Sequence, residues 1–530
     1  MPASIPRYLA ETAQRLPEKV AIISRTRSIT FGELYQEALA TAECLREMGL
    51  QTGDRVGICM EKTVDQVVAL LGVLLANGVV VPILPRLKGP NIRHIVENSG
   101  MAALITDADR LGEVAEFSGL TRLVTGHGEV SHDWPNLPYL RRFMQARASF
   151  DRIVGDNAAI IYSSGSTGRP KGILISHRNL AEGAEIVVQY LGTNEQDRIG
   201  CMLSFNFDYG MNQIWQTLYT GCTLVLHELA LPNDLFAMLT KERITALPVM
   251  PVFITKMFDR RLKVNSAAFD FSRLRYVCST GGRLSSDMIV DLRGAFPGAR
   301  VFSMFGLTEA FRSTYLAPDK LDSHPTSVGK AIPECQVMVL DENGDECAPH
   351  AVGELVHRGA TVTKGYWNDP VNTAKSFRTH PRFPGETLVY SGDRVYRDEE
   401  GFLYFVARAD DMIKTKGFRV SPTEVETEVV RHPEVVDAVA FAVPNITIGE
   451  DVACAYTSVS GAPLAEPVLK QFLKTSLPNH MVPALLVHFD SFPILGNAGK
   501  LDRKAIKQAA YERLRIEPDA AASRPAPRGA

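Results

Sequence analysis

The stretch SSGSTGRPKG, residues 163–172, has the composition of a loop that binds an anion. It holds three glycines, four hydroxyl side chains and two cations, and it follows the apolar run AAIIY. Backbone N–H groups, hydroxyls and a lysine can together surround phosphate oxygens. An ordinary surface turn is the alternative, because Ser, Gly and Pro favour turns. The Walker A spacing is absent, but a buried strand precedes the stretch and the helical sequence ISHRNLAEGAEIVV follows it. Because phosphate is often held between a strand and a helix, we predict a phosphate loop.

The composition of the whole chain restricts the class of protein. A chain of 530 residues is too long for one hydrophobic core, so roughly two to four structural units are expected. The net charge of −3 gives no general attraction to nucleic acid, and we expect no nucleic-acid partner. The eight cysteines are scattered without the spacing of a zinc site, which indicates buried reduced thiols and a cytoplasmic protein. The first residues contain no apolar segment of the signal-peptide kind.

Residues 67–85, VVALLGVLLANGVVVPILP, are nearly all apolar and approach the length of a membrane span. Asn77–Gly78 is a turn signal, however, and two prolines follow it closely. A buried helix, a turn and a buried strand explain the pattern better. We therefore predict no membrane span.

Strand-like and helical segments alternate through the first three quarters of the chain. The strand-like runs include RVGICM, AALIT, AAIIY, TLVLH and LRYVCST. This alternation predicts an α/β fold with parallel sheets covered by helices on both faces. From about Pro333, short strands joined by turns indicate a β-rich unit, and a charged segment at 407–426 precedes about a hundred further residues of strands and helices. The Pro- and Ala-rich end is predicted to be a disordered tail.

Five motifs resemble those of one family and occur in its order. YSSGSTGRPKGILISHRNL closely resembles the signature loop of the adenylate-forming superfamily, which includes acyl-CoA synthetases, adenylation domains of peptide synthetases and firefly luciferase. FSMFGLTEA, GELVHRGATVTKGYWNDP, VYSGDRVYRDEEGFLYFVARADDMIKTKGFRVSPTEVE and GNAGKLDRKAI resemble its later motifs, so that the likeness spans about residues 10–510. The resemblance implies an N-terminal domain of two helix-covered sheets plus a β-barrel-like unit (1–409), a small mobile α+β C-terminal domain (410–513) and a tail (514–530).

The resemblance implies a two-step ligase reaction. A carboxylate attacks the α-phosphorus of ATP, pyrophosphate leaves, and a thiol then displaces AMP. Because an anion attacks an anion in the first step, cations and hydrogen-bond donors must neutralise charge. With ATP and Mg²⁺ as cofactors, the implied nucleotide-binding residues are Ser163, Ser164, Gly165, Thr167, Gly168 and Lys171 for the β- and γ-phosphates, Gly282, Phe305 and Gly306 around the adenine motif, Thr308 and Glu309 for the α-phosphate and magnesium, Asp393 for the ribose hydroxyls, and Arg408 near ribose and phosphate.

The resemblance also gives Lys500 a catalytic role and Asp410 the position of a hinge. Lys500 would bridge the carboxylate and the α-phosphate, and rotation of the small domain at Asp410 would withdraw it after adenylation. Two departures from the family pattern are visible: Ala407 replaces a usual Gly, and Asn497 replaces a frequent Pro. Neither residue has a chemical role.

The segment LSFNFDYGMNQIWQ lies where the family forms its acid-binding pocket. Asp208 follows Phe207 as in α-amino-acid adenylation domains, where the aspartate pairs with the substrate ammonium. Alternatively, backbone groups or Asn212 satisfy Asp208 and the acid is a simple acyl substrate. Arg312 could pair with Asp208 or bind a second carboxylate on the substrate. FGLTEAFRSTYL also resembles acyl-CoA ligases associated with bacterial exosortase loci, which leaves the acid open.

The thiol acceptor is open as well, because coenzyme A and a carrier protein present the same phosphopantetheine arm. No carrier segment follows Lys500, so a carrier protein would act in trans. The partners expected are therefore a small carboxylic or amino acid and one of these two acceptors. Luciferase-like oxidation and a non-catalytic adenylate-binding protein are the alternative functions, and the second requires damaged catalytic positions.

Overall fold

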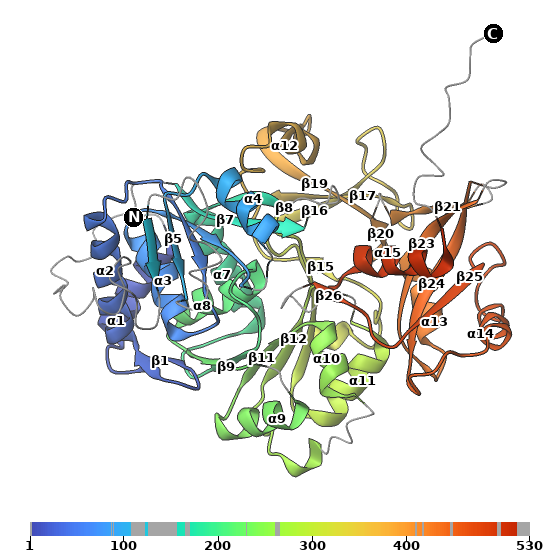
Figure 1. Cartoon of the computed structure of the whole chain (residues 1–530), viewed down its shortest axis with the longest axis horizontal. Helices are drawn as coiled ribbons and strands as arrows, with labels where there is room; N and C mark the ends of the chain where they lie inside the picture. The colour runs from blue at the N-terminus through green and yellow to red at the C-terminus, as the bar shows by residue number, and fades with distance from the viewer. Residues whose placement is uncertain are drawn as a thin grey trace, which may run out of the picture.

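A large body, built from the first three quarters of the sequence, lies beside a smaller C-terminal unit drawn in red in Figure 1. The computed structural model describes residues 3–85, 87, 89–107, 122–125, 156–164, 170–228, 231–259, 266–282, 284–408, 411–415, 418–445, 449–495 and 500–516. Seven of the eight cysteines are buried, as predicted for structural thiols.

One sheet of the large body has six strands in the order β6-β5-β3-β4-β7-β8. Its strands are Arg122–Thr125 (β6), Ala103–Thr106 (β5), Arg55–Cys59 (β3), Val79–Pro82 (β4), Asn157–Ser164 (β7) and Pro170–Ser176 (β8). All neighbours run parallel except β7 and β8. Helix α3 (Val64–Leu75) joins β3 to β4, and α4 (Gly89–Ser99) joins β4 to β5. This is the predicted strand–helix–strand arrangement.

A second sheet has nine strands in the order β15-β14-β13-β12-β11-β9-β10-β1-β2. Its strands are Lys330–Ala331 (β15), Thr314–Leu316 (β14), Arg300–Phe305 (β13), Tyr276–Ser279 (β12), Ala246–Val249 (β11), Arg198–Cys201 (β9), Thr223–Leu226 (β10), Val20–Ile23 (β1) and Ser28–Thr30 (β2). The strands from β13 to β1 run parallel, and the flanking strands run antiparallel. Helices α9 (Pro232–Lys241), α10 (Pro251–Met257) and α11 (Ser286–Ala295) pack against this sheet in one hydrophobic cluster.

One hydrophobic core contains side chains from both sheets, including Ile22 of β1 and Val56 of β3. The helices in it are α1 (Ile5–Arg15), α2 (Phe31–Glu47), α3, α7 (His177–Leu191) and α8 (Asp208–Thr220). α7 begins at Ser176 because the Ser176 and Asn179 side chains cap each other's backbone N–H groups. The shared core fixes α7 and α8 between the two sheets.

The apolar residues 67–85 form most of α3 and all of β4. Every residue of both elements is buried, and the chain turns between them at Asn77, which has a φ of 61°. Within the described ranges, none of the helices combines the length and hydrophobicity that a membrane crossing needs. The predicted helix, turn and strand are confirmed.

The predicted β-rich unit is a five-stranded antiparallel sheet. Its strands are Cys335–Leu340 (β16), Gly353–Gly359 (β17), Phe377–His380 (β18), Phe383–Arg397 (β19) and Leu403–Arg408 (β20). The order is β16-β17-β19-β18, and β20 also pairs with β19. The long β19 pairs with β18 along its first half and with β20 along its second half. Within the described strands the pairing does not close into a barrel.

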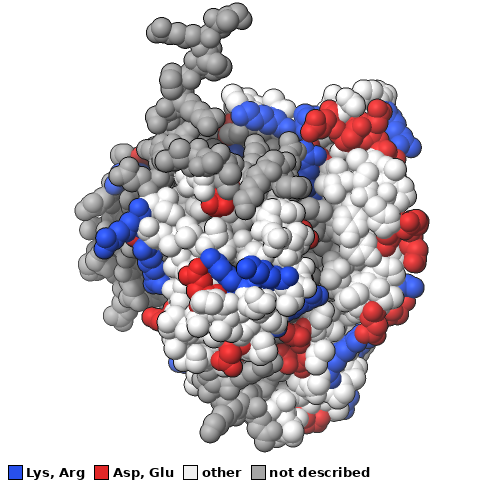
Figure 2. Space-filling view, turned by 90° about the vertical axis from the view of Figure 1, so that its right-hand side faces the viewer, with Lys and Arg blue, Asp and Glu red and all other residues white. Residues whose placement is uncertain are grey.

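The C-terminal unit is the predicted α+β structure. It contains β21 (Ile413–Thr415), β22 (Phe418–Val420), β23 (Val435–Asn445), β24 (Gly449–Ser458), β25 (Leu485–Phe489), β26 (Ile494–Leu495), β27 (Lys500–Leu501), α13 (Pro422–Val430), α14 (Glu466–Leu473) and α15 (Arg503–Leu514). Its two hydrophobic clusters contain only residues from Ile413 onward. On the side of the molecule shown in Figure 2, basic and acidic side chains are interspersed over the described residues.

Candidate active site

The predicted phosphate loop connects β7 to β8, and its two ends are adjacent. Ser163 pairs with Lys171 across the two strands, and Ser164 pairs with Pro170. Gly165, Thr167 and Gly168 lie outside the described residues. The helix that was predicted to follow the loop begins only at His177, after the seven residues of β8. The order is therefore strand, loop, strand and helix, and the loop does not open directly into the helix.

Strand β8 is hydrogen-bonded on both edges. Its first edge pairs with β7, and its second contacts residues 364–367, which follow β17 in the sequence. The N–H of Leu174 donates to Gly365 O over 2.9 Å, and the N–H of Trp367 donates to Gly172 O over 2.7 Å. These bonds bring Tyr366 beside the strand that carries Lys171.

Tyr366 connects Lys171 to Glu309. The Lys171 Nζ atom lies 5.3 Å from the centre of the Tyr366 ring, and the Tyr366 hydroxyl donates a hydrogen bond of 2.8 Å to Glu309 Oε1. Burial raises the pKa of Tyr366, and the charge and hydrogen bond of Glu309 raise it further. The tyrosine therefore stays protonated and remains a donor. Sequence reasoning missed this residue, although it lies within the quoted motif GELVHRGATVTKGYWNDP.

Thr308 and Glu309 lie in a turn directly after β13. The Glu309 carbonyl accepts the N–H and the hydroxyl of Thr363, both over 2.9 Å. Gly306 permits the turn to fold back, because a Cβ there would lie 2.4 Å from Phe311 O. The backbone at Glu309 is thus positioned by the hydrogen bonds from Thr363 and by the close approach of Gly306 to Phe311.

Glu309 suits a magnesium ion that also binds phosphates. No group of three or more His, Cys, Asp or Glu side chains suitable for a metal occurs among the residues that the structure describes. Mg²⁺ is commonly bound by one or two carboxylates together with substrate phosphates rather than by a protein cage. A single glutamate in the turn after β13 fits that mode of binding.

Asp393 and Arg408 face each other on β19 and β20. Their side chains form an ion pair of 3.1 Å, and Arg408 also donates to Ser391 O. Asp393 is only 2% exposed, and burial raises its pKa to about 6, against the opposing effect of Arg408. The charge of Glu309 raises this pKa further, which puts the two carboxylates in one electrostatic neighbourhood.

Phe305 and Gly282 lie at the carboxyl ends of two neighbouring parallel strands. Phe305 ends β13, with its ring 6.0 Å from that of Phe405, and Gly282 lies just beyond β12. A Cβ on Gly282 would lie 3.2 Å from Pro251 Cγ, so little space remains for a side chain. Ligands of α/β proteins typically bind at this edge of a sheet.

Asp208 begins α8, directly after Phe207. Its carboxylate accepts the N–H of Tyr209 over 2.8 Å, so a nearby backbone group does satisfy it in part. Neither Arg312 nor Asn212 bonds to it in the part of the chain that the structure describes. The predicted alternative in which Arg312 pairs with Asp208 is therefore wrong.

Arg312 is 2% exposed and lies under aromatic rings rather than beside a carboxylate. Its guanidinium carbon lies 4.3 Å from the centre of the Tyr209 ring and 5.2 Å from that of Phe311. Because Tyr209 belongs to α8, this contact joins two of the predicted substrate-binding segments.

Lys500 begins β27 and pairs with Leu495 of β26. In Figure 1 the β26 segment extends from the C-terminal unit toward the large body. The side chain of Lys500 and the whole of Asp410 lie outside the described part of the chain, so their predicted roles remain predictions.

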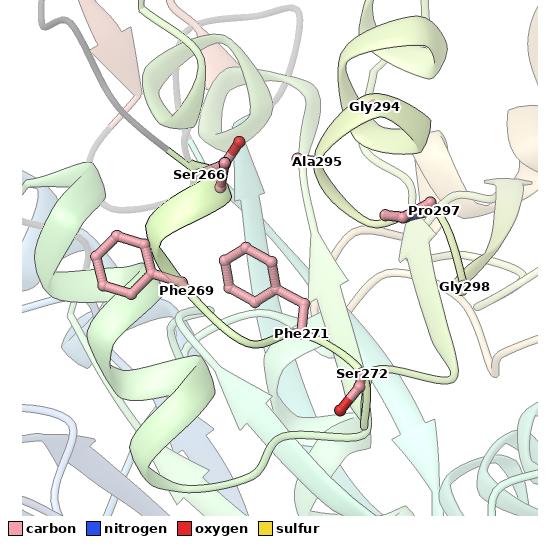
Figure 3. Close-up of a pocket in the computed structure, with 9 residues that line it drawn as sticks. Ser266, Phe269, Phe271, Ser272, Gly294, Ala295, Pro297 and Gly298 are labelled. Carbon is pink, nitrogen blue, oxygen red and sulfur yellow. The ribbon is translucent and has the colours of Figure 1, made fainter.

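A surface pocket of about 380 Å³ lies elsewhere, at the end of α11 (Figure 3). Phe269 and Phe271 line it, together with small residues such as Gly294 and Ala295. None of the described residues that line it can titrate or bind a metal, and none is a predicted site residue.

Comparisons with protein families and with known proteins agree with the resemblance carried by the five sequence motifs. The family model "AMP-binding enzyme" matches residues 9–367, and the model "AMP-binding enzyme C-terminal domain" matches residues 424–498. The chain is 28% identical over 529 residues to Tyrocidine synthase 1 and 29% identical over 524 residues to Tyrocidine synthase 2, both from Brevibacillus parabrevis. These matches cover 97% and 98% of this chain but only 46% and 14% of those proteins. The chain therefore spans less than half the length of these relatives.

Solved structures resemble the chain over nearly its whole length. ATP-bound MatB from Rhodopseudomonas palustris is 26% identical, with a TM-score of 0.85 and coverage of 96% of this chain and 99% of that one. A benzoate CoA ligase from Burkholderia xenovorans LB400 is 25% identical, with a TM-score of 0.83 and coverage of 95% and 99%.

Proposed function

Because the chain belongs to the AMP-binding enzyme family, we propose that it is an AMP-forming ligase that activates a carboxylic acid with ATP. The acid forms an acyl-adenylate as pyrophosphate leaves, and a thiol then displaces AMP to give a thioester. The observation that carries this proposal is the set of contacts that joins Lys171 to Tyr366 and Tyr366 to Glu309, beside the buried carboxylate of Asp393 and its ion pair with the exposed Arg408.

The charges of this cluster suit attack on a phosphorus atom by a carboxylate. Two anions meet in the transition state, so fixed positive groups lower its free energy. Lys171 and Ser163 lie at the ends of the loop and bind the departing phosphates, with Ser164, Gly165, Thr167 and Gly168 as the proposed remainder of the loop. A magnesium ion held by Glu309 would neutralise phosphate charge.

We assign the ribose and adenine of ATP to residues of β19, β20 and the end of β13. Asp393 accepts hydrogen bonds from the two ribose hydroxyls, for which an ionised carboxylate has enough acceptor sites. Arg408 holds that carboxylate in its charged form at 3.1 Å. Phe305 lies against the adenine, and Gly282 and Gly306 leave room for the ring and for the turn that carries Thr308.

Lys500 must reach this cluster from the C-terminal unit. We assign it the bridge between the acid and the α-phosphate, and we place the domain boundary and the hinge at Asp410. Support comes from the hydrophobic clusters: each contains residues from only one side of position 410. Two units without a shared core can rotate relative to each other.

The acceptor of the acyl group is the phosphopantetheine thiol of coenzyme A or of a carrier protein acting in trans. Relatives named as tyrocidine synthases and a structural relative named as a CoA ligase support the two choices equally. Luciferase-like oxidation is not favoured, because these relatives are named as synthases and a ligase. A non-catalytic role is not favoured either, because Lys171, Glu309 and Asp393 are present and brought together.

The products of nucleotide cleavage test this proposal. With ATP, Mg²⁺ and an accepted acid, the protein should release AMP and pyrophosphate, and labelled pyrophosphate should exchange into ATP. Release of ADP and orthophosphate would contradict it. Adding coenzyme A in one reaction and a phosphopantetheinylated carrier protein in another should yield a thioester with only one of them, which identifies the acceptor.

A further inference from the structure

Arg312 is a buried cation without an anion. It is 2% exposed, and no acidic side chain lies within ion-pair distance of it in the described part of the chain. The rings of Tyr209 and Phe311, at 4.3 and 5.2 Å, stabilise the charge only in part. Taking an arginine out of water without a partner is costly, so the position requires an explanation.

The unpaired atoms of Arg312 form one edge of the guanidinium. Nε and Nη2 are buried and have no hydrogen-bond partner. These two nitrogens point their N–H groups in the same direction, which is the geometry that binds both oxygens of a carboxylate. A water molecule could occupy one of the two positions, but a carboxylate matches both positions and the charge.

Asn212 supplies a second unpaired buried donor on α8. The residue is fully buried, its Oδ1 accepts from Gln216 Nε2 over 2.8 Å, and its Nδ2 has no partner. Asn212 lies three positions after Tyr209, so the two side chains share one face of α8. Tyr209 therefore has two groups of unpaired donors near it. One is Asn212 Nδ2 on its own helix, and the other is the Nε–Nη2 edge of Arg312, which lies over its ring.

Arg312 is also close to the turn that carries Glu309. It follows Glu309 by three residues, and a Cβ on Gly306 would lie 2.9 Å from the Arg312 Cα. A group bound at Arg312 thus lies beside the segment to which the α-phosphate is assigned. An acid with one carboxylate at that phosphate could place another polar group at Arg312.

We propose that the acid activated by this enzyme carries a second carboxylate, which binds the Nε–Nη2 edge of Arg312 with Asn212 Nδ2 as a further donor. The inference rests on the proposed function, since it concerns the acid of that reaction. Both dicarboxylic acids and acidic amino acids have this chemistry. Asp208, which begins the same helix, would bind the ammonium group of the amino acids and would have no such role with the dicarboxylic acids.

The test is pyrophosphate exchange with pairs of acids that differ only in the second carboxylate. The pairs are succinate with butyrate, glutarate with valerate, aspartate with 2-aminobutyrate, and glutamate with norvaline. We expect the second carboxylate to raise kcat/KM by about 100-fold in at least one pair, because a site built for a polar group rejects the analogue that lacks it. Comparison of the amino and des-amino pairs then separates the two sources of the carboxylate.

Variants at Arg312 identify the group responsible. Arg312→Met should abolish the preference, and Arg312→Lys should retain part of it because the charge remains without the fork. Arg382→Met, which removes an exposed arginine in the turn between β18 and β19, is the matched control and should keep the full preference. The preferred acid should also raise the thermal unfolding midpoint of the native protein but not that of Arg312→Met, a readout that does not depend on turnover.

The outcomes separate this inference from the function on which it rests. Exchange with monocarboxylic acids that equals or exceeds exchange with their dicarboxylic partners overturns the inference and leaves the ligase function standing. A preference that persists in a folded Arg312→Met variant also overturns it. Hydrolysis to ADP with every acid overturns the function itself.

Discussion

The Tyr366 hydroxyl lies 2.8 Å from Glu309 Oε1, a hydrogen bond that joins residues 57 positions apart. The hydrogen bond orients the carboxylate of Glu309, the proposed magnesium ligand. The centre of the Tyr366 ring also lies 5.3 Å from Lys171 Nζ. A single tyrosine thus orients the carboxylate assigned to the metal and contacts the cation assigned to the phosphates.

Removal of this hydroxyl should weaken catalysis without unfolding the protein. In Tyr366→Phe the ring can still pack against Phe377, at 5.5 Å, but Glu309 loses its donor. We expect pyrophosphate exchange to fall by about 10-fold and the Mg²⁺ concentration at half-maximal rate to rise, as measured by a magnesium titration. Tyr404→Phe removes another tyrosine hydroxyl bound to a carboxylate, that of Asp398, and should leave both quantities unchanged. An unchanged magnesium titration in Tyr366→Phe would contradict the positioning role.

Asp393 should make stability depend on pH in a defined interval. Burial raises its pKa from 3.8 to about 6, so the native protein binds more protons than the unfolded chain between these values. Its contribution to stability is therefore lost as the pH rises through about 6. Asp393→Asn should raise the free energy of unfolding by about 3 kcal/mol at pH 7.5 and by about half of that at pH 5, measured by urea unfolding.

The same variant should bind ATP more weakly, because an amide offers the ribose hydroxyls fewer acceptor sites than a carboxylate. Stability and binding would then change in opposite directions. A gain in stability that is equal at both pH values would show that burial does not shift the pKa of Asp393.

Lys500 should be required for only one of the two half-reactions. Lys500→Ala should lower acyl-adenylate formation by about 100-fold, because charge at the attacked phosphate is no longer neutralised. Thioester formation from a supplied acyl-adenylate should be preserved, as measured by consumption of the thiol. Lys507→Ala, on the adjacent α15, is the control and should affect neither step. Equal loss of both half-reactions would contradict the assignment.

The buried carboxylate of Asp197 should make Arg275 important for stability. Arg275 Nη1 donates to Asp197 Oδ1 over 2.7 Å, and the Asp197 side chain is 1% exposed. Arg275→Met should lower the free energy of unfolding by about 3 kcal/mol, because it leaves a buried charge without its partner. Arg293→Met breaks the exposed pair with Asp322, where water already solvates both charges, and should change the free energy of unfolding far less. Similar losses in the two variants, compared by urea unfolding, would contradict this reasoning.

Local sequence patterns predicted the elements that are buried and close in sequence. The alternating runs became β3, β5, β7, β10 and β12, and the apolar residues 67–85 became α3 and β4. The ordered motifs correctly indicated the AMP-binding enzyme family, while the likeness to exosortase-associated ligases finds no support among the relatives compared.

Pairings between distant segments could not be predicted in the same way. The open antiparallel sheet depends on how β19 divides its length between β18 and β20, and no local pattern encodes that division. Tyr366 was missed because its partner Glu309 precedes it by 57 residues. Charge alone allows Arg312 either to pair with Asp208 or to bind a second carboxylate of the substrate, and only the fold shows that it lies under Tyr209 and Phe311.

The double-edged bonding of β8 has a mechanical consequence. Strand β8 is hydrogen-bonded to β7 on one side and to residues 364–367 on the other, so a displacement of β8 would be transmitted to both neighbours. Any displacement of that strand pulls on Tyr366 and, through its hydroxyl, on the Glu309 carboxylate. The strand that carries Lys171 and the glutamate that would hold a magnesium ion are thereby mechanically linked through one tyrosine, so a change at either end is transmitted to the other.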